Sequence, residues 1–215
     1  MVKWMGPPFV AAYKGIAKLM IKLNVHPNVV TIAGTAGVLF GALWFFPRAG
    51  SNIFSLFVGT MVVMWCAFLD MTDGMIARAT GKASRFGAFL DSTLDRFADA
   101  AVFGGIAWGM LDDQPYHRIT ALAAILCMSL GSIVPYARAR AEGLGINTKT
   151  GIATRVDRLV IALIAAGLVG LGVHILVLTY TLFFLSAAAL ITVVQRGWDV
   201  WKANKLNPAL PKVSS

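Results

Sequence analysis

The sequence predicts an all-α integral membrane protein with six transmembrane helices preceded by an amphipathic interfacial helix. Of its 215 residues, 58% are hydrophobic and only 13% are charged, a balance unlike that of a soluble domain. Several uncharged stretches approach or exceed the ~20 residues that cross the hydrocarbon core of a bilayer. The basic residues gather in alternate loops between these stretches. Together, these observations favour a multi-pass membrane protein.

The segment before the first predicted span has an amphipathic pattern. Four apolar residues recur on one face and three lysines on another: Phe9, Tyr13, Ile16 and Met20, and Lys14, Lys18 and Lys22. This pattern is typical of a helix that lies in the membrane interface, although a flexible basic leader is the alternative. We expect residues 1–25 to form this helix, which ends at His26-Pro27 because proline disfavours a helical residue ahead of it.

Uncharged stretches supply five of the six predicted spans. They cover residues 27–47, 49–69, 119–137 and 159–195. The last stretch is long enough for two crossings, with a glycine-rich turn near residues 167–174. The remaining span must run from about Arg85 to Leu111, because it separates loops that the other spans put on opposite sides.

The span from Arg85 to Leu111 is unusual because it carries Asp91, Asp95 and Asp99. Lipid does not tolerate such charge, so these side chains must face the protein interior or water. No second domain is evident. We therefore expect one membrane domain over residues 1–215, with a six-helix core at 26–200 and a basic cytoplasmic tail at 201–215.

The formal net charge of +9 follows the predicted topology. Basic residues precede the first span, join the second to the third and the fourth to the fifth, and follow the sixth. Only Arg48 and Arg118 lie in the alternate loops. The positive-inside rule then predicts a protein of the cell membrane with both termini in the cytoplasm. This distribution argues against a nucleic-acid partner.

Four aspartates form two closely spaced pairs, Asp70 with Asp73 and Asp91 with Asp95. Helical residues three or four apart are neighbours, about 5–6 Å apart at Cβ. We therefore expect each pair to lie on one face of a helix. The short connection between the second and third spans brings the two pairs together near the cytoplasmic surface.

Four converging carboxylates repel one another unless cations lie among them. Oxygen ligands without nearby histidine or cysteine favour Mg²⁺ or Mn²⁺ over zinc. Two such ions could polarise a pyrophosphate and bring a hydroxyl in line with it. The alternative is that the aspartates pair with Arg78, Arg85 and Arg96 to fasten helices together.

The signature around these aspartates resembles that of the CDP-alcohol phosphotransferase family. It reads Asp70-Met-Thr-Asp73-Gly74-Met-Ile-Ala77-Arg78, eight residues, Gly87, three residues, Asp91, three residues, Asp95. The resemblance implies a six-helix, typically homodimeric fold and two divalent metals per subunit on the four aspartates. It also implies attack by an alcohol on a CDP-linked donor such as CDP-diacylglycerol, with Asp95 as the base and CMP released. A carboxylate one turn from a metal ligand suits that role.

The same resemblance assigns a CDP-lipid site. Its expected residues are Asn28, Val29, Val30, Thr31, Gly74, Arg78 and Ser84. Asparagine is also a favoured helix N-cap, so capping is the alternative role of Asn28. For Gly74 and Gly87, spacing alone leaves open whether a ligand or a neighbouring helix approaches the backbone.

Arginines on the aspartates' side of the membrane suit an acceptor that bears phosphate, because guanidinium binds phosphate in a bidentate fashion. The expected acceptor residues are Arg138, Arg155, Arg158 and Arg196. Anchoring to anionic membrane lipids is the alternative.

Residues 136–142 and 155–159 resemble the corresponding regions of actinobacterial-type phosphatidylinositol phosphate synthases, which use myo-inositol 1-phosphate. The sequence departs from that pattern with Arg138 in place of lysine and with Pro135 before Tyr136. Phosphatidylglycerophosphate synthase, using glycerol 3-phosphate, is the alternative enzyme.

A divalent-cation transporter is a more distant possibility, because acids within membranes also line ion pathways. The predicted acids cluster near one face of the membrane, and the chain has no evident repeat. Transporters typically place such residues near mid-membrane, in broken helices of repeated halves. The enzyme interpretation is therefore favoured.

Overall fold

The computed structural model describes residues 7–148, 151 and 154–206, and within these residues the chain is helical with no strand. The elements are α1 (Pro7–Lys22), α2 (Pro27–Phe45), the 3₁₀-helix η1 (Phe46–Arg48), α3 (Phe54–Asp70), α4 (Asp73–Ala79), α5 (Arg85–Gly109), α6 (His117–Gly143), α7 (Arg155–Gly170) and α8 (Leu176–Leu206). The predicted all-α class is therefore confirmed.

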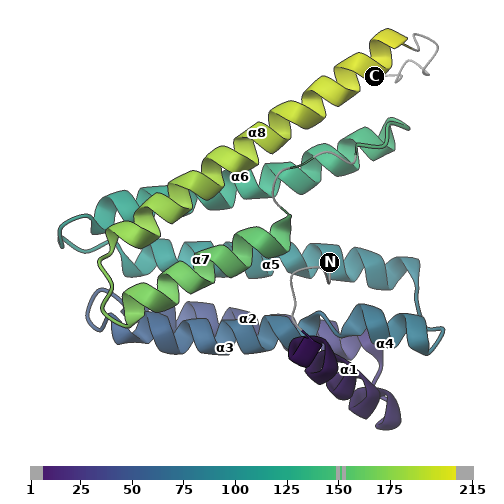
Figure 1. Ribbon diagram of the computed structural model, residues 1–215, viewed down its shortest axis with the longest axis horizontal. Coiled ribbons are helices and arrows are strands. Elements are labelled where there is room, and N and C mark those ends of the chain that lie inside the picture. Colours follow the sequence, from purple (N-terminus) through teal and green to yellow (C-terminus); the bar gives the residue numbers. More distant parts are fainter. Residues whose placement is uncertain (1–6, 149–150, 152–153, 207–215) are drawn as a thin grey trace.

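Six long helices, α2, α3 and α5 to α8, run back and forth along one direction (Figure 1). The turns after η1, α5 and α7 lie at one end of the bundle. The short helix α4 and the final turns of α6 and α8 lie at the other end. The main packed pairs are α6 with α8, α2 with α3 and α2 with α5. Helix α5 also packs against α6, so it lies between α2 and α6 in the middle of the bundle.

Four of the described helical segments are long and apolar enough to cross a membrane. They are Pro27–Arg48, Phe54–Ala79, His117–Gly143 and Leu176–Lys205. These segments correspond to the first, second, fourth and sixth predicted spans. Helix α5 falls outside this group because of its charged residues, and α7, with 16 residues, is shorter than the ~20 that a span needs.

Helix α1 packs against the end of the bundle that carries α4. Ala17 is buried with Val30 and Ile76, which joins α1 to α2 and α4. Lys18 and Lys22 are exposed, as the amphipathic pattern predicts. The side chains of Phe9, Tyr13 and Lys14 lie outside the described residues.

The structure corrects one detail of the predicted helices. We expected Asp70 and Asp73 on one continuous helix, but α3 ends at Asp70 and α4 begins at Asp73. In the turn between them, the Thr72 hydroxyl donates a hydrogen bond to the Leu69 carbonyl at 2.6 Å. Such a local bond competes with the helical pattern. The two carboxylates are therefore carried by different helices.

Candidate metal centre and adjoining cavity

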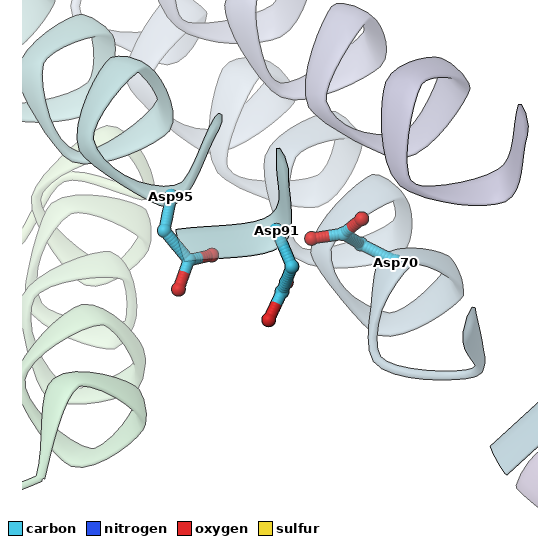
Figure 2. A group of neighbouring side chains, drawn as sticks. All are labelled: Asp70, Asp91 and Asp95. Carbon is cyan, nitrogen blue, oxygen red and sulfur yellow. The ribbon is translucent and has the colours of Figure 1, made fainter. Parts of the chain in front are cut away.

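Three carboxylates converge where α3 ends beside α5. Asp70, Asp91 and Asp95 each place an oxygen within 4.8 Å of the other two. Figure 2 shows Asp91 between its two neighbours, with the Asp70 carboxylate directed toward it. Asp70 comes from the last position of α3, whereas Asp91 and Asp95 lie one helical turn apart on α5. A turn of one helix and the end of another therefore build the cluster.

The chemistry of this cluster fits a hard divalent cation. All three ligand groups are carboxylates, the donor type preferred by Mg²⁺ and Mn²⁺. The Asp70 Oδ1 atom is buried and has no hydrogen-bond partner among the described residues. A buried carboxylate oxygen without a partner is costly, and a metal ion would satisfy it. Asp91 is exposed, so the cluster is open to an incoming ligand.

Gly34 on α2 brings α3 close enough to present Asp70. A Cβ atom at Gly34 would lie 2.8 Å from the Asp70 Cβ and 3.1 Å from its Cα. Real Cβ atoms do not approach this closely, so any larger residue must displace the end of α3. The position of Asp70 therefore depends on a residue that has no side chain with which to bind metal.

Asp73 lies outside the group of three and is held by two hydrogen bonds. The Thr31 hydroxyl donates to its Oδ2 at 2.5 Å, and the Gly74 amide donates to its Oδ1. Asp73 and Asp91 both line a cavity next to the cluster. Asp91 therefore belongs to both the cluster and the cavity wall.

This cavity gathers most of the residues that the sequence assigned to the CDP-lipid site. Its lining is Pro27, Asn28, Thr31, Asp73, Gly74, Ala77, Arg78, Lys82, Ala83, Ser84, Gly87, Ala88 and Asp91. Five of the seven expected residues are among them. The other two are not, because Val29 is 55% exposed and Val30 is buried against Ala17 and Ile76.

Two neighbouring groups explain why Asn28 faces the cavity. The N-cap of α2 is His26, whose ring nitrogen accepts a hydrogen bond from the backbone N–H of Asn28. The capping alternative for the Asn28 side chain is therefore wrong. A Cβ atom at Gly87 would lie 3.2 Å from the Asn28 Oδ1. Gly87 therefore leaves room for the Asn28 side chain at the start of α5.

Lys82 also lines the cavity, although it was not among the site residues expected from the sequence. Its Nζ donates to the Asn24 Oδ1 at 3.3 Å. Its position in the connection between the two acidic pairs was the available signal. Together with Arg78, it gives the cavity two cations.

The four arginines expected at an acceptor site have different surroundings. Arg155 contacts the carboxylate cluster, with its guanidinium 2.6 Å from Asp95 Oδ1. Arg158 is only 6% exposed and pairs with Asp99 at 2.7 Å. Arg138 pairs with Glu142 on the exposed end of α6, and Arg196 of α8 donates to a carbonyl of α6.

A helical bundle with apolar spans, a carboxylate cluster suited to a divalent metal and an adjoining cavity with two cations is the arrangement of a membrane protein with a candidate metal site. The family model described as CDP-alcohol phosphatidyltransferase matches residues 24–194. The chain belongs to this family.

Two relatives within this family carry the same enzyme name. The chain is 41% identical over 187 residues to the phosphatidylinositol phosphate synthase of Streptomyces avermitilis, covering 84% of this chain and 74% of the relative. It is 38% identical over 190 residues to the enzyme of the same name from Mycolicibacterium smegmatis, covering 87% and 83%.

The chain is also similar to solved structures of an enzyme with this name. The crystal structure of the Mycobacterium tuberculosis phosphatidylinositol phosphate synthase in complex with manganese and citrate matches with a TM-score of 0.78 at 36% identity, covering 88% of both chains. The structure of that enzyme with CDP-DAG bound matches with a TM-score of 0.77 at 36% identity, covering 88% of this chain and 93% of the other.

The packing at Gly34 generates a test of the metal centre. We expect Gly34→Ala to weaken Mn²⁺ binding by about tenfold, the lower end of the effect of disturbing groups behind metal ligands. Titration of the purified protein with Mn²⁺, followed by electron paramagnetic resonance, measures this affinity. Gly104→Ala is the matched control, because a Cβ atom there meets nothing within 4 Å. Unchanged Mn²⁺ affinity in Gly34→Ala would contradict the role of this contact.

Proposed function

We propose that this chain is a phosphatidylinositol phosphate synthase. It transfers the phosphatidyl group of CDP-diacylglycerol to a hydroxyl of myo-inositol 1-phosphate, and it releases CMP. The observation that carries the proposal is the carboxylate cluster of Asp70, Asp91 and Asp95, with a cavity on one side and Arg155 on the other. Relatives at 38–41% identity that bear this name support the choice of acceptor.

The cavity is the proposed site for the CDP group of the donor. Arg78 and Lys82 supply positive charge for the diphosphate, and Thr31, Asn28 and Ser84 supply polar groups around it. Arginine and lysine are the usual partners of phosphate oxygens. The diacylglycerol tails would then remain in the bilayer beside α2.

Two Mg²⁺ or Mn²⁺ ions per subunit are the proposed cofactors. Asp70, Asp91 and Asp95 form one group of ligands, and Asp73, which lines the same cavity as Asp91, adds a fourth carboxylate. When bound, such ions polarise the diphosphate and neutralise its charge. The Mycobacterium tuberculosis structure in complex with manganese supports a metal in this family.

Asp95 is the proposed general base. A base must lie within hydrogen-bonding reach of the proton that it removes. Asp95 takes the proton from the inositol hydroxyl as the new oxygen–phosphorus bond forms and the bond to CMP breaks. Its carboxylate is oriented by Arg155 at 2.6 Å, so it is already held in place before the acceptor binds.

Arg155 is also the proposed first contact of the acceptor phosphate, because it lies beside the base. Arg138 and Arg196 come from α6 and α8, which pack against each other, and we propose them as further partners for this phosphate. Arg158 was expected among them. Its burial and its pairing with Asp99 favour a supporting role instead.

We further propose six spans, with α5 and α7 crossing beside the four apolar segments, and α1 in the membrane interface. The chain is then one domain of residues 1–215 in the cell membrane, with both termini and the site in the cytoplasm and with lipids and a second subunit as partners. The basic loops and the common direction of α5, α7 and their neighbours support this arrangement.

Cysteine labelling tests this orientation. In intact cells, an impermeant thiol reagent should label Ser51→Cys, in the turn after η1, and not Gly81→Cys, in the turn after α4. The expected difference follows because these turns lie at opposite ends of the bundle. The reverse pattern would place the site outside the cell.

The acceptor is tested by an assay of CMP release from CDP-diacylglycerol and Mg²⁺ in detergent. We expect release with myo-inositol 1-phosphate and little with glycerol 3-phosphate. The opposite preference would identify a phosphatidylglycerophosphate synthase. Mg²⁺ transport in vesicles, without CMP release from CDP-diacylglycerol in the presence of either acceptor, would instead support a transporter.

The base is tested by Asp95→Asn. We expect CMP release to fall by about 10²–10⁴-fold, the usual contribution of a positioned acid or base. Mn²⁺ affinity, measured on the same preparation, should fall much less, because the amide oxygen can remain a ligand. Equal losses of activity and Mn²⁺ affinity would show that Asp95 is a ligand only.

A further inference from the structure

We propose that Asp99 and Arg158 are positioning residues, which hold the guanidinium of Arg155 against Asp95. The inference rests on the proposed function, in which Asp95 is the base and Arg155 meets the acceptor phosphate. It assigns a purpose to a buried ion pair that neither the metal centre nor the cavity uses.

Asp99 is the centre of this arrangement. It lies two helical turns after Asp91 on α5 and is only 7% exposed. One carboxylate oxygen accepts from Arg155 Nε at 2.9 Å, and the other accepts from an Arg158 terminal nitrogen at 2.7 Å. A buried carboxylate with both oxygens committed has little freedom to rotate. Asp99 therefore fixes the edge of the Arg155 guanidinium that faces it.

The rest of the Arg155 guanidinium reaches Asp95. One terminal nitrogen lies 2.6 Å from Asp95 Oδ1, and the other donates to the Asp95 backbone oxygen at 3.2 Å. These contacts and the bond to Asp99 use three of the five N–H donors of the group. Within the described part of the chain, two donors are left for the phosphate of an acceptor. The orientation set by Asp99 thus directs Arg155 toward both the base and its substrate.

The start of α7 places both arginines on one side of the helix. Thr154 is the N-cap, and it forms a reciprocal capping box with Asp157. This fixes where the first turn begins, and residues three apart in that turn are neighbours. Arg155 and Arg158 therefore approach Asp99 together.

Helix α6 provides a socket for Arg158. A Cβ atom at Gly131 would lie 2.6 Å from the central guanidinium carbon, so only glycine leaves room for the group. The Gly131 carbonyl accepts a hydrogen bond from Arg158 at 3.2 Å. The ring of Phe103 lies 5.9 Å from the guanidinium carbon, within the range of a cation–π contact.

Pro135 explains why the Gly131 carbonyl is available. In a helix this carbonyl would accept from the amide of the residue four positions later, and Pro135 has no amide hydrogen. The proline is thus compatible with a continuous α6. It leaves an acceptor that Arg158 uses.

Gly131→Ala tests the proposal without altering any charged residue. The added methyl group must displace Arg158 and, through Asp99, Arg155. We expect the KM for the acceptor to rise about tenfold, the effect of losing one oriented charge-assisted contact, while the KM for CDP-diacylglycerol and the Mn²⁺ affinity change by less than about twofold. Gly104→Ala, where a Cβ atom meets nothing within 4 Å, is the control and should match the wild type.

The assay includes both myo-inositol 1-phosphate and glycerol 3-phosphate. The wild-type preference tests the proposed function, and the change in KM for whichever acceptor is used tests the positioning role. A parallel rise in the KM of donor and acceptor, or no change in either, would overturn the role of Asp99 and Arg158.

A second measurement is independent of catalysis. In the metal-free protein, hydrogen exchange at the start of α7 should be faster in Gly131→Ala than in Gly104→Ala, because the contacts of Arg155 and Arg158 are weakened. Asp99→Asn should produce the same two changes, and its melting temperature shows whether it folds. Wild-type exchange and acceptor KM in a folded Asp99→Asn variant would refute the proposal.

Discussion

The structure depends on neutralising acidic side chains inside an apolar helical bundle. A charge buried without a partner costs several kcal/mol, and removing one member of a buried pair costs about 3–5 kcal/mol. Arg155 and Arg158 meet this need for Asp95 and Asp99. Both arginines lie in the first turn of α7, where the helix dipole disfavours cations, so the α5 carboxylates must hold them there.

The bundle also requires close contact between helices, and two of these contacts place Asp70 and the arginine partner of Asp99. Gly34 lets α3 bring Asp70 to the cluster, and Gly131 admits the guanidinium of Arg158 between α5 and α6. Gly105 lets α5 approach α2, where a Cβ atom would lie 2.7 Å from the Ala42 carbonyl oxygen. In each case a glycine, which has no side chain, allows a neighbouring helix or side chain to approach closely.

Much of this arrangement could be predicted from sequence because its signals are local. Apolar stretches located the helices, and the family resemblance located five of the CDP-lipid residues that line the cavity. The turn after Asp70 could not be foreseen, because it depends on the local bond of Thr72 within an otherwise helical pattern. Nor could spacing separate Arg155 from Arg158, since their difference arises from contacts with Asp99 on α5 and Gly131 on α6.

The spacing of the acids on α5 explains how one helix serves two purposes. Asp91, Asp95 and Asp99 recur every four residues, and each such step turns about 40° around a helix of 3.6 residues per turn. Along this stripe the side chains change from exposed Asp91 to half-buried Asp95 and buried Asp99. The first faces Asp70 and the cavity, whereas the last pairs with Arg155 and Arg158 of α7. Asp95, between them, belongs to both groups, which is the position a base needs if it is to act between a metal-bound donor and a phosphate-bearing acceptor.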